Sequence, residues 1–402
     1  MDLNGHRIFL SICFLISLFV ASAQRSPAVE DQERGIASPH PDTGVIVITP
    51  QFVSAGPFSE GLAAVQIGDN QDGKWGYIDK SGRFAIDPQF DRAEAFSEGL
   101  AAVRSGDDKT GKWGFIDKSG KYVITPQWDH VTAFSGGLSV VRTGNIVMGK
   151  DRVIDKQGRY ASDLKSGVIL PCENGMTLVG INVSWVSGGV NRHFGFVDKS
   201  GHYVINPVFD DAFCFTEGMA AVRTGGAEAG GWGFIDTTGR FVIPPQWGSV
   251  YPFNNGIATV ATSGGLAKKW GAIDRTGQTI IPQQFPEPLI FHDGLALEPI
   301  TTYTWVTDQR GRSRVRPDTT YSFINKNGTR STGLQWRSAS SFSQGLAPVM
   351  LDESPACKWG YVDQSGRYRV SPQYLDAQPF SEGMAAVLIG VEKKGKWGYI
   401  AR

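Results

Sequence analysis

The sequence of 402 residues lacks the short patterns that mark common enzyme classes. It contains no Gly-x-Ser-x-Gly, no His-Glu-x-x-His, no Cys-x-x-Cys, and no phosphate-binding Gly-x-x-x-x-Gly-Lys-(Ser/Thr) loop. Its 6 histidines are scattered singly along the chain, as is typical of surface or turn positions. We therefore expect no enzymatic activity, no metal and no cofactor.

The chain also lacks an excess of charge of either sign. Lys and Arg number 39, against 39 Asp and Glu. A balanced protein has no overall field to attract a polyanion. We therefore do not expect a nucleic-acid partner.

Cysteine is scarce, and one of the 4 cysteines lies in a short apolar run near the N-terminus. That run, Ile8 to Val20, precedes Ala21-Ser22-Ala23 and predicts a signal peptide over residues 1–23. The alternative, a retained membrane anchor, is disfavoured because the run is too short to span a bilayer. We thus expect a secreted or periplasmic protein that is not an integral membrane protein after signal removal. Residues 24–43 are rich in proline and charge and predict a flexible linker.

Three cysteines then remain for an oxidising compartment: Cys172, Cys214 and Cys357. They allow at most one intramolecular disulfide. The sequence does not indicate whether two of them pair, or which two.

What the sequence has in abundance is a repeat. Glycines that follow a Phe-Ser-Glu-like tripeptide recur in steps of 38 residues, broken by one step of 43 and one of 51; they are Gly61, Gly99, Gly137, Gly175, Gly218, Gly256, Gly294, Gly345 and Gly383. A second series has the same steps and is mostly Trp-Gly: Trp75, Trp113, Asp151, Phe194, Trp232, Trp270, Tyr321, Trp359 and Trp397. A fixed period of this length predicts units that bury their apolar faces against one another. Residues 44–402 are therefore expected to form a single domain of nine units.

Each unit predicts a three-stranded antiparallel meander. In one unit the apolar run 100–103 is followed by a polar loop, then by the strand 112–116. The turn at 117–120 ends in Gly120 and leads to the strand 121–124, which Pro126 ends. The segment after each such proline fits a turn of helix or a fourth short strand, and the sequence leaves both open. The predicted fold class is all-β.

These motifs resemble those of the bacterial WG (KWG) repeat family. The resemblance rests on Lys74-Trp75-Gly76-Tyr77-Ile78-Asp79, with Phe58-Ser59-Glu60-Gly61 before it and Pro88-Gln89-Phe90 after it. It extends from about Gly44 to Ile400. It implies a β-repeat scaffold, often secreted, and supplies no catalytic residue.

The two ends of the repeat region predict how the units are arranged. Residues 45–52 stand where a unit's last strand belongs, and residues 396–400 where its middle strand belongs. Pairing them would complete one unit, close a ring and remove both exposed sheet edges. We therefore favour a propeller-like ring over an open β-solenoid, and the ring predicts that Ile48 and Trp397 lie on adjacent strands.

The recurrent residues favour structural roles. One large residue per unit beside a glycine is typical of a core between units, so we assign Trp75, Trp113, Phe194, Trp232, Trp270, Tyr321, Trp359 and Trp397 to the structural repeat core. A row of these rings that stacks sugars is the alternative. The recurrent aspartates, such as Asp79 and Asp117, and the glutamates before the loop glycine, such as Glu60 and Glu98, are interpreted as turn residues rather than calcium ligands.

The two interruptions of the period are the better candidates for binding. The longer insertion holds Tyr303, Trp305, Arg310, Arg312, Arg314 and Arg316, and the shorter holds Trp185. Trp, Tyr and Arg are enriched at interface anchors, and insertions in repeat proteins often mark the binding face. Neutral variation in loops is the alternative.

These patterns together predict a secreted, non-catalytic repeat scaffold that binds a protein or a cell-envelope glycan. The alternatives are a polysaccharide-acting hydrolase that uses paired carboxylates, and a purely structural envelope component. Two carboxylates converging in a pocket would favour the hydrolase.

Overall fold

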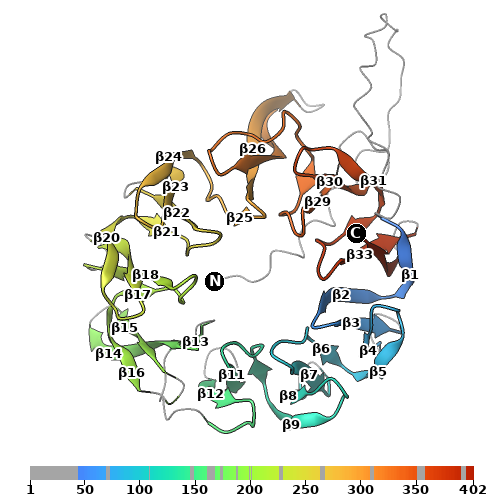
Figure 1. Cartoon of the computed structure of the whole chain (residues 1–402), viewed down its shortest axis with the longest axis horizontal. Coiled ribbons are helices and arrows are strands. Elements are labelled where there is room, and N and C mark those ends of the chain that lie inside the picture. The colour runs from blue at the N-terminus through green and yellow to red at the C-terminus, as the bar shows by residue number, and fades with distance from the viewer. Residues whose placement is uncertain are drawn as a thin grey trace, which may run out of the picture.

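The structure, a computed structural model, describes residues 44–68, 73–107, 109–144, 149–160, 168–172, 175–186, 189–198, 200, 202–225, 230–262, 268–307, 312–350, 358–390 and 395–402. Every regular element of this part of the chain is a β-strand, and the strands form nine separate antiparallel sheets. The sheets follow one another around a ring (Figure 1). The all-β, propeller-like prediction is confirmed. The predicted signal peptide and linker lie outside the described residues, and none of the described elements is a helix long and apolar enough to cross a membrane.

Most sheets are four-stranded blades, with strand order equal to chain order. The first strands are β2 (Ser54–Ser59), β6 (Arg92–Ala93), β10 (His130–Val131), β13 (Val168–Pro171), β17 (Asp211–Ala212), β21 (Ser249–Val250), β25 (Phe291–His292), β28 (Ser338–Ala339) and β32 (Asp376–Ala377). The second strands are β3 (Leu62–Ile67), β7 (Ala101–Ser105), β11 (Leu138–Thr143), β14 (Thr177–Val186), β18 (Met219–Thr224), β22 (Ile257–Ala261), β26 (Leu295–Thr307), β29 (Leu346–Met350) and β33 (Met384–Ile389).

The third strands, most of which carry the Trp-Gly motif, are β4 (Lys74–Ile78), β8 (Lys112–Ile116), β12 (Lys150–Asp155), β15 (Gly189–Val197), β19 (Gly231–Asp236), β23 (Trp270–Asp274), β27 (Ser313–Asn325), β30 (Trp359–Asp363) and β34 (Lys396–Ala401). The fourth strands are β5 (Phe84–Phe90), β9 (Tyr122–Trp128), β16 (Tyr203–Phe209), β20 (Phe241–Trp247), β24 (Thr279–Phe285), β31 (Tyr368–Tyr374) and β1 (Ile46–Phe52). Figure 1 shows first strands such as β21 and β25 toward the centre of the ring and fourth strands such as β9 and β24 toward its rim.

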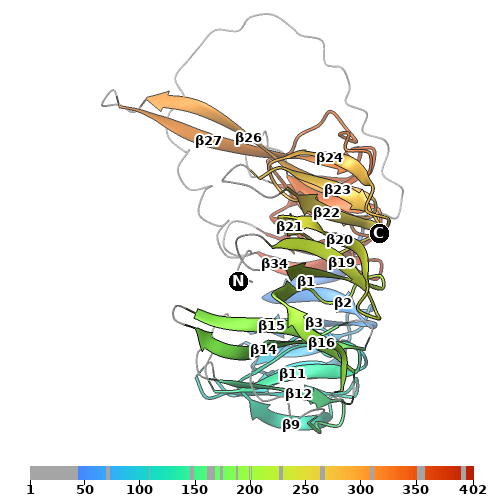
Figure 2. The same ribbon diagram turned by 90° about the vertical axis from the view of Figure 1, so that its left-hand side faces the viewer.

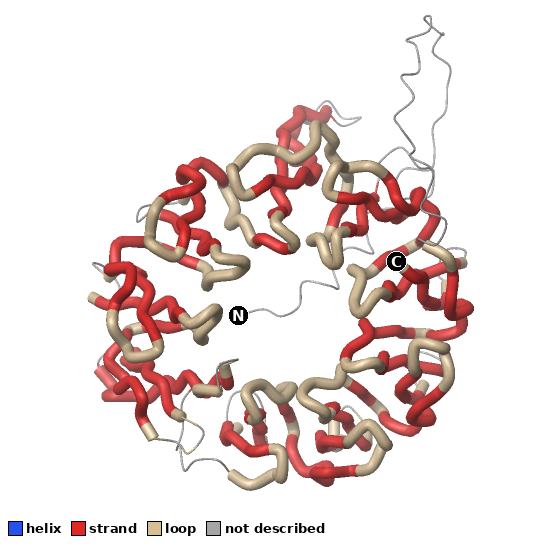
Figure 3. Tube along the Cα trace, in the orientation of Figure 1, coloured by secondary structure: helices blue, strands red, loops and turns tan. Residues whose placement is uncertain are grey.

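The segment that follows each proline, which the sequence left open between a helical turn and a strand, forms the short first strand of a blade. It spans only two residues in seven of the nine sheets, and Figure 3 shows it as a brief stretch of strand between loops. In the blade β6 to β9, Arg92 and Ala93 pair with Arg104 and Val103 of β7. The predicted three-stranded meander therefore carries a fourth strand on its inner edge.

The ring closes through its two ends. Strand β1 is the fourth strand of the sheet β32-β33-β34, so the first strand of the chain completes the last blade. Ile48 pairs with Tyr399 and Phe52 with Trp397, which confirms the predicted adjacency of the two end strands. The cluster Ile48, Phe52, Ala55, Phe58 and Tyr399 then joins this blade to the blade β2 to β5.

The apolar core lies between blades, because short second strands are buried on both faces. In β3, Ala63 and Val65 pack into the cluster shared with the last blade, whereas Leu62 and Ala64 pack into the cluster shared with β6 to β9. Alternation along a strand sends neighbouring side chains to opposite faces. This sheet thus contributes to two cores, each shared with a neighbouring blade.

The glycine of the Trp-Gly motif is required by a close backbone approach. A Cβ added at Gly114 would lie 2.6 Å from the carbonyl oxygen of Ile124 on the neighbouring strand β9. The register between these strands shifts there, because Trp113 pairs with Trp128 but Phe115 pairs with Ile124. The bulge around Pro126 brings the two backbones together, and only glycine leaves room for it.

Candidate functional site

The recurrent Trp side chains lie at the margins of the cores between blades. Trp232 is buried and belongs to its cluster, whereas Trp75, Trp113, Phe194, Trp270, Trp359 and Trp397 are partly exposed and pack against theirs. Tyr321 is partly exposed, and its backbone forms an isolated β-bridge with the backbone of Trp336. The fully buried aromatic rings stand two residues further along the strand, at Tyr77, Phe115, Phe196, Phe234, Phe323, Tyr361 and Tyr399.

The recurrent aspartates hold tight turns. The Oδ1 atom of Asp79 accepts hydrogen bonds from the backbone N–H of Ser81 at 2.8 Å and of Arg83 at 3.1 Å. The Ser81 hydroxyl also donates to it and lowers the pKa of Asp79. The turn interpretation is confirmed. Within the described residues, no group of three His, Cys, Asp or Glu side chains could hold a metal ion.

The recurrent glutamates link one blade to the next. Glu60 adopts a positive φ of 53° in its turn, and its carboxylate accepts the backbone N–H of Gly99 in the following blade at 3.1 Å. The Lys118 ammonium lies 3.2 Å from the same carboxylate. The neighbouring Ser59 hydroxyl donates to the carbonyl oxygen of Phe96 at 2.7 Å. We call this group of contacts the blade clasp.

The clasp repeats around the ring with few changes. Its carboxylate or amide contacts are Glu98 to Gly137, Glu217 to Gly256, Asp293 to Gly345, Gln344 to Gly383 and Glu382 to Gly61. Burial alone would raise the pKa of Glu98, but the Lys156 ammonium and the Gly137 N–H outweigh it and lower that pKa. The recurrent carboxylates are therefore engaged in holding the ring together.

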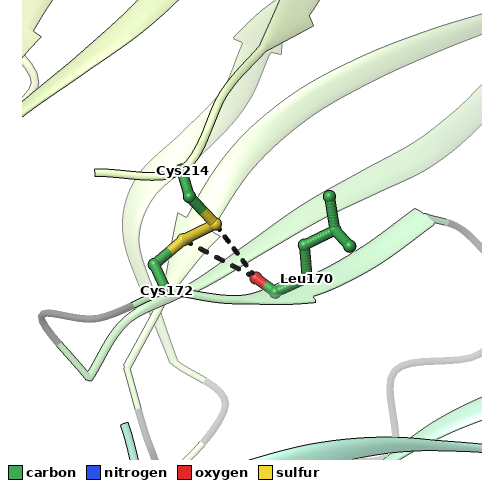
Figure 4. Close-up of a disulfide and its surroundings, with 3 residues drawn as sticks. All are labelled: Leu170, Cys172 and Cys214. Carbon is green, nitrogen blue, oxygen red and sulfur yellow. Dashed lines mark hydrogen bonds between the residues drawn. A yellow bond between two sulfur atoms is a disulfide. The ribbon is translucent and has the colours of Figure 1, made fainter. Parts of the chain in front are cut away.

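One blade junction is also held covalently. Cys172 occupies the loop position that holds Phe96 or Phe58 in other blades, and it forms a disulfide with Cys214 of the next blade (Figure 4). The carbonyl oxygen of Leu170 lies 3.6 Å from each sulfur. The sequence left the pairing of the cysteines open, and the structure assigns it; Cys357 lies outside the described residues.

Both interruptions of the period fall at the same place in a blade. The shorter one lengthens the connection from β14 to β15 and the longer one lengthens the connection from β26 to β27, in each case the second and third strands. Because second and third strands run alike in every blade, both hairpins extend from the same face of the ring, as Figure 2 shows. Trp185 pairs with Val190 in the shorter hairpin.

The longer hairpin is a two-sided ribbon. Tyr303 lies opposite Pro317 and Trp305 lies opposite Val315, so these four side chains share one face. The side chain partners on the other face are Thr304 with Arg316 and Val306 with Arg314. Tyr303 and Trp305 are 71% and 75% exposed, and Arg312, Arg314 and Arg316 are exposed too. Arg310 lies outside the described residues.

A separate pocket of about 450 Å³ lies between the blade β6 to β9 and the next. Its lining includes Glu94, Ser97, Trp113 and His130. A serine, a histidine and a carboxylate in one pocket invite comparison with a nucleophilic triad. However, the Ser97 hydroxyl donates to the carbonyl oxygen of Phe134 at 2.7 Å, the same clasp contact that Ser59 makes.

The pocket was not predicted from the sequence. The sequence feature that could have indicated it is the residue five positions before the loop glycine. This residue is Glu94 beside the pocket, whereas two other units have Phe213 and Tyr251 there. The two faces of the long hairpin were not foreseen either, although its alternating residues predict them once both strands are known.

Comparison with known proteins gives one clear match. The repeat described as "WG containing repeat" matches residues 42–70, 75–109, 113–145, 194–226, 232–264, 270–297 and 359–397. The unmatched stretches contain the units at Asp151 and Tyr321, which lack the Trp-Gly pair. No curated protein matches the sequence.

Several solved structures resemble the fold at low identity. Dipeptidyl peptidase 4 of Porphyromonas gingivalis is 9% identical, with a TM-score of 0.45 and coverage of 85% of this chain and 65% of that one. The β-propeller domain of the Trilobed protease from Pyrococcus furiosus is 7% identical, with a TM-score of 0.35 and coverage of 78% and 97%. The tricorn protease is 11% identical, with a TM-score of 0.34. The match covers 83% of this chain and 36% of the tricorn protease chain. Similarity at this level gives no information on activity.

Proposed function

Since the matched segments cover more than half of the chain, this protein belongs to the WG repeat family, and we propose that it is a secreted or periplasmic, non-catalytic binding scaffold. Its partner is a protein or a glycan of the cell envelope. The ring supplies a rigid support, and the face that carries the two long hairpins recognises the partner.

The observation that carries this proposal is the exposed aromatic face of the β26 to β27 hairpin. Two strands alone are only marginally stable in water without further cover. Here Tyr303 and Trp305 reach out beyond the blade with most of their surface in solvent. Aromatic side chains of this kind gain most when a partner buries them, and they dominate the energetics of many interfaces.

The opposite face of the ribbon supplies charge. Arg314 and Arg316 lie there opposite Val306 and Thr304, and both arginine side chains are exposed. Arginine donates to carboxylates and phosphates through a planar fork of N–H groups. A partner that wraps around the ribbon would therefore combine an apolar contact on one side with acidic groups on the other.

The engagement of the acidic residues supports a non-catalytic role. A retaining or inverting glycosidase needs two carboxyl groups within about 5 to 10 Å of each other beside the substrate. The recurrent glutamates instead accept backbone N–H groups in the blade clasps. The pocket beside Trp113 has one carboxylate in its lining, that of Glu94. Within the part of the chain that the structure describes, we find no pair of converging carboxylates in this pocket that would favour the hydrolase alternative.

The disulfide supports the export part of the proposal. Disulfides persist in oxidising compartments and are rare in the cytosol. A bond between Cys172 and Cys214 is therefore in keeping with the signal peptide that residues 1–23 predict.

The test compares capture by two forms of the protein. Immobilised wild-type protein and the Tyr303→Ala/Trp305→Ala variant are incubated with solubilised envelope proteins and, separately, with isolated cell-wall polymer. Bound protein is identified by mass spectrometry and bound polymer by sugar analysis. We expect the double variant to capture at least tenfold less partner than the wild type does.

A matched control removes an exposed apolar side chain elsewhere. Val208→Ala changes a residue that is 61% exposed on β16, and it should capture as much as the wild type. Both variants should keep the wild-type unfolding midpoint, because exposed side chains contribute little to stability. Equal capture by the double variant and the wild type would overturn the proposal.

A further inference from the structure

The pocket beside Trp113 is distinct from the hairpin face and has features of a small-ligand site. It lies between two blades, with a volume of about 450 Å³. Apolar walls come from Ala95, Ala102 and Ala133, and polar groups from Glu94 and His130. Pockets that bind small molecules commonly combine an apolar lining with a few placed polar groups.

Trp113 lines this pocket, and the position that covers the equivalent Trp in two other blades holds a carboxylate here. In the blade β17 to β20, Phe213 covers Trp232, with ring centroids 5.2 Å apart. In the blade β21 to β24, Tyr251 covers Trp270 at 5.5 Å. The equivalent position beside Trp113 holds Glu94, so an aromatic cover is replaced by a carboxylate and a cavity.

The Glu94 carboxylate differs from the other recurrent acids in having no holding contact. Within the described part of the chain, only its backbone is bonded: its carbonyl oxygen accepts the Tyr77 hydroxyl at 2.7 Å and its N–H donates to Ala102 at 2.9 Å. The Glu94 side chain is exposed, although the atoms packed beside its carboxyl raise the pKa of Glu94 by desolvation. A carboxylate that accepts no hydrogen bond from the described protein groups can accept them from a ligand in the pocket.

The charges around the pocket select a neutral ligand. An anion would be repelled by Glu94. A cation would be repelled by the nearby Arg92 guanidinium, whose charge also acts through space on the Glu94 carboxylate. A neutral ring with hydroxyl groups meets neither obstacle.

We propose that this pocket binds a neutral pyranose, with the C–H face of the sugar stacked on Trp113 and its hydroxyl groups donating to Glu94. A pyranose has an apolar face of C–H bonds and a rim of hydroxyls, which matches an aromatic ring next to a carboxylate. His130 offers a further hydrogen-bonding group at the rim. The site makes no use of the long hairpin.

The experiment measures saturation-transfer NMR and calorimetric titration of the full chain with three methyl β-glycosides, those of glucose, galactose and N-acetylglucosamine. We expect at least one to bind with a Kd on the order of 1 mM, as is reasonable for one small pocket. Tetramethylammonium chloride is the cationic probe and should give no transfer.

The deciding variant is Glu94→Phe, which copies the aromatic cover that Phe213 provides in a blade of the same fold. It should fold like the wild type and weaken binding at least tenfold, because the ring fills the pocket. Glu94→Gln should weaken binding several-fold, because the charge-assisted hydrogen bonds are lost. Trp305→Ala, on the hairpin, is the control and should bind each glycoside as the wild type does.

Three results would overturn the proposal: no transfer from any of the three glycosides to the wild type, undiminished binding by Glu94→Phe, or binding of tetramethylammonium in place of the sugars. None of these results bears on the hairpin face. When polymer capture by the hairpin is measured with Glu94→Phe present in both proteins, binding in the pocket does not contribute, and the two proposals fail separately.

Discussion

The carboxylate of Glu382 accepts a hydrogen bond of 3.0 Å from the backbone N–H of Gly61, which precedes it by 321 positions. The same contact joins Glu60 to Gly99 in the interior of the chain, at 3.1 Å. The Ser381 hydroxyl also repeats the contact of Ser59, because it donates to the carbonyl oxygen of Phe58. The seam between the two ends of the chain is thus built like a seam between neighbouring blades.

Removing the clasp between the last and first blades should therefore destabilise the fold as much as removing a clasp inside the ring. Glu382→Ala and Glu60→Ala each remove one carboxylate that accepts a backbone N–H and faces a lysine. We expect each to lower the free energy of unfolding by about 1 kcal/mol, since both groups are partly solvated. Urea unfolding followed by Trp fluorescence measures this. If Glu60→Ala lowered the free energy of unfolding and Glu382→Ala left it unchanged, the ring would be open in solution.

The glycine of the Trp-Gly motif should not tolerate a methyl group. In Gly114→Ala the new Cβ would meet the Ile124 carbonyl oxygen, a backbone atom that cannot move aside alone. We expect the free energy of unfolding to fall by roughly 2 to 4 kcal/mol, measured from the shift of the urea midpoint.

Gly99→Ala is the matched control for this change. Gly99 has a positive φ of 87° and nothing within 4 Å of the added Cβ, so only the backbone strain of about 1 to 2 kcal/mol applies. If Gly99→Ala were the more damaging of the two, close approach would not explain the motif.

Reduction should weaken the ring at one junction. The disulfide joins residues 42 apart in sequence, and loops of this size gain about 2 to 4 kcal/mol from a cross-link. Dithiothreitol should therefore lower the thermal midpoint of the wild type. The Cys172→Ser/Cys214→Ser variant should start at the lower midpoint and not respond. A wild-type midpoint that is insensitive to reduction would contradict the bond.

Acid should destabilise the protein through its clasps and turns. The pKa values of Glu98, Glu382 and Asp79 lie below their ordinary values of 4.5, 4.5 and 3.8 in the folded chain. The folded state then binds fewer protons than the unfolded state, so this stabilisation is complete above the ordinary values and is lost as the pH falls through the lowered ones. Unfolding free energies should fall from pH 6 to pH 3. The decline should be shallower in Glu98→Gln, and parallel curves would show that Glu98 makes no contribution.

The sequence predicted the nine units, the all-β class and the closing pair of end strands, because three motifs recur in register and the two ends complement each other. It could not predict the inner strand at Arg92 and Ala93, since two residues carry no periodicity. The recurrent Trp side chains do pack against the cores between blades, but the sequence did not show that the fully buried aromatic position lies two residues further along, at residues such as Tyr77 and Phe115.

The candidate sites were predicted less completely. The long hairpin was found because an insertion is visible as a break in the period. The pairing of Cys172 with Cys214 and the pocket at Glu94 depend on which side chains meet across a blade junction. That information lies in the packing of neighbouring blades, and a single unit does not contain it.

The pairing of β1 with β34 sets an order of events during synthesis. Ribosomes make β1 long before they make its partner strand β34. Until then Ile48 and Phe52 have no blade to complete, and the contact that fixes them spans nearly the whole chain, which makes it slow to form. Strand β1 therefore waits for β34 before it can reach its place, and a chain stopped before Lys396 would leave two sheet edges open.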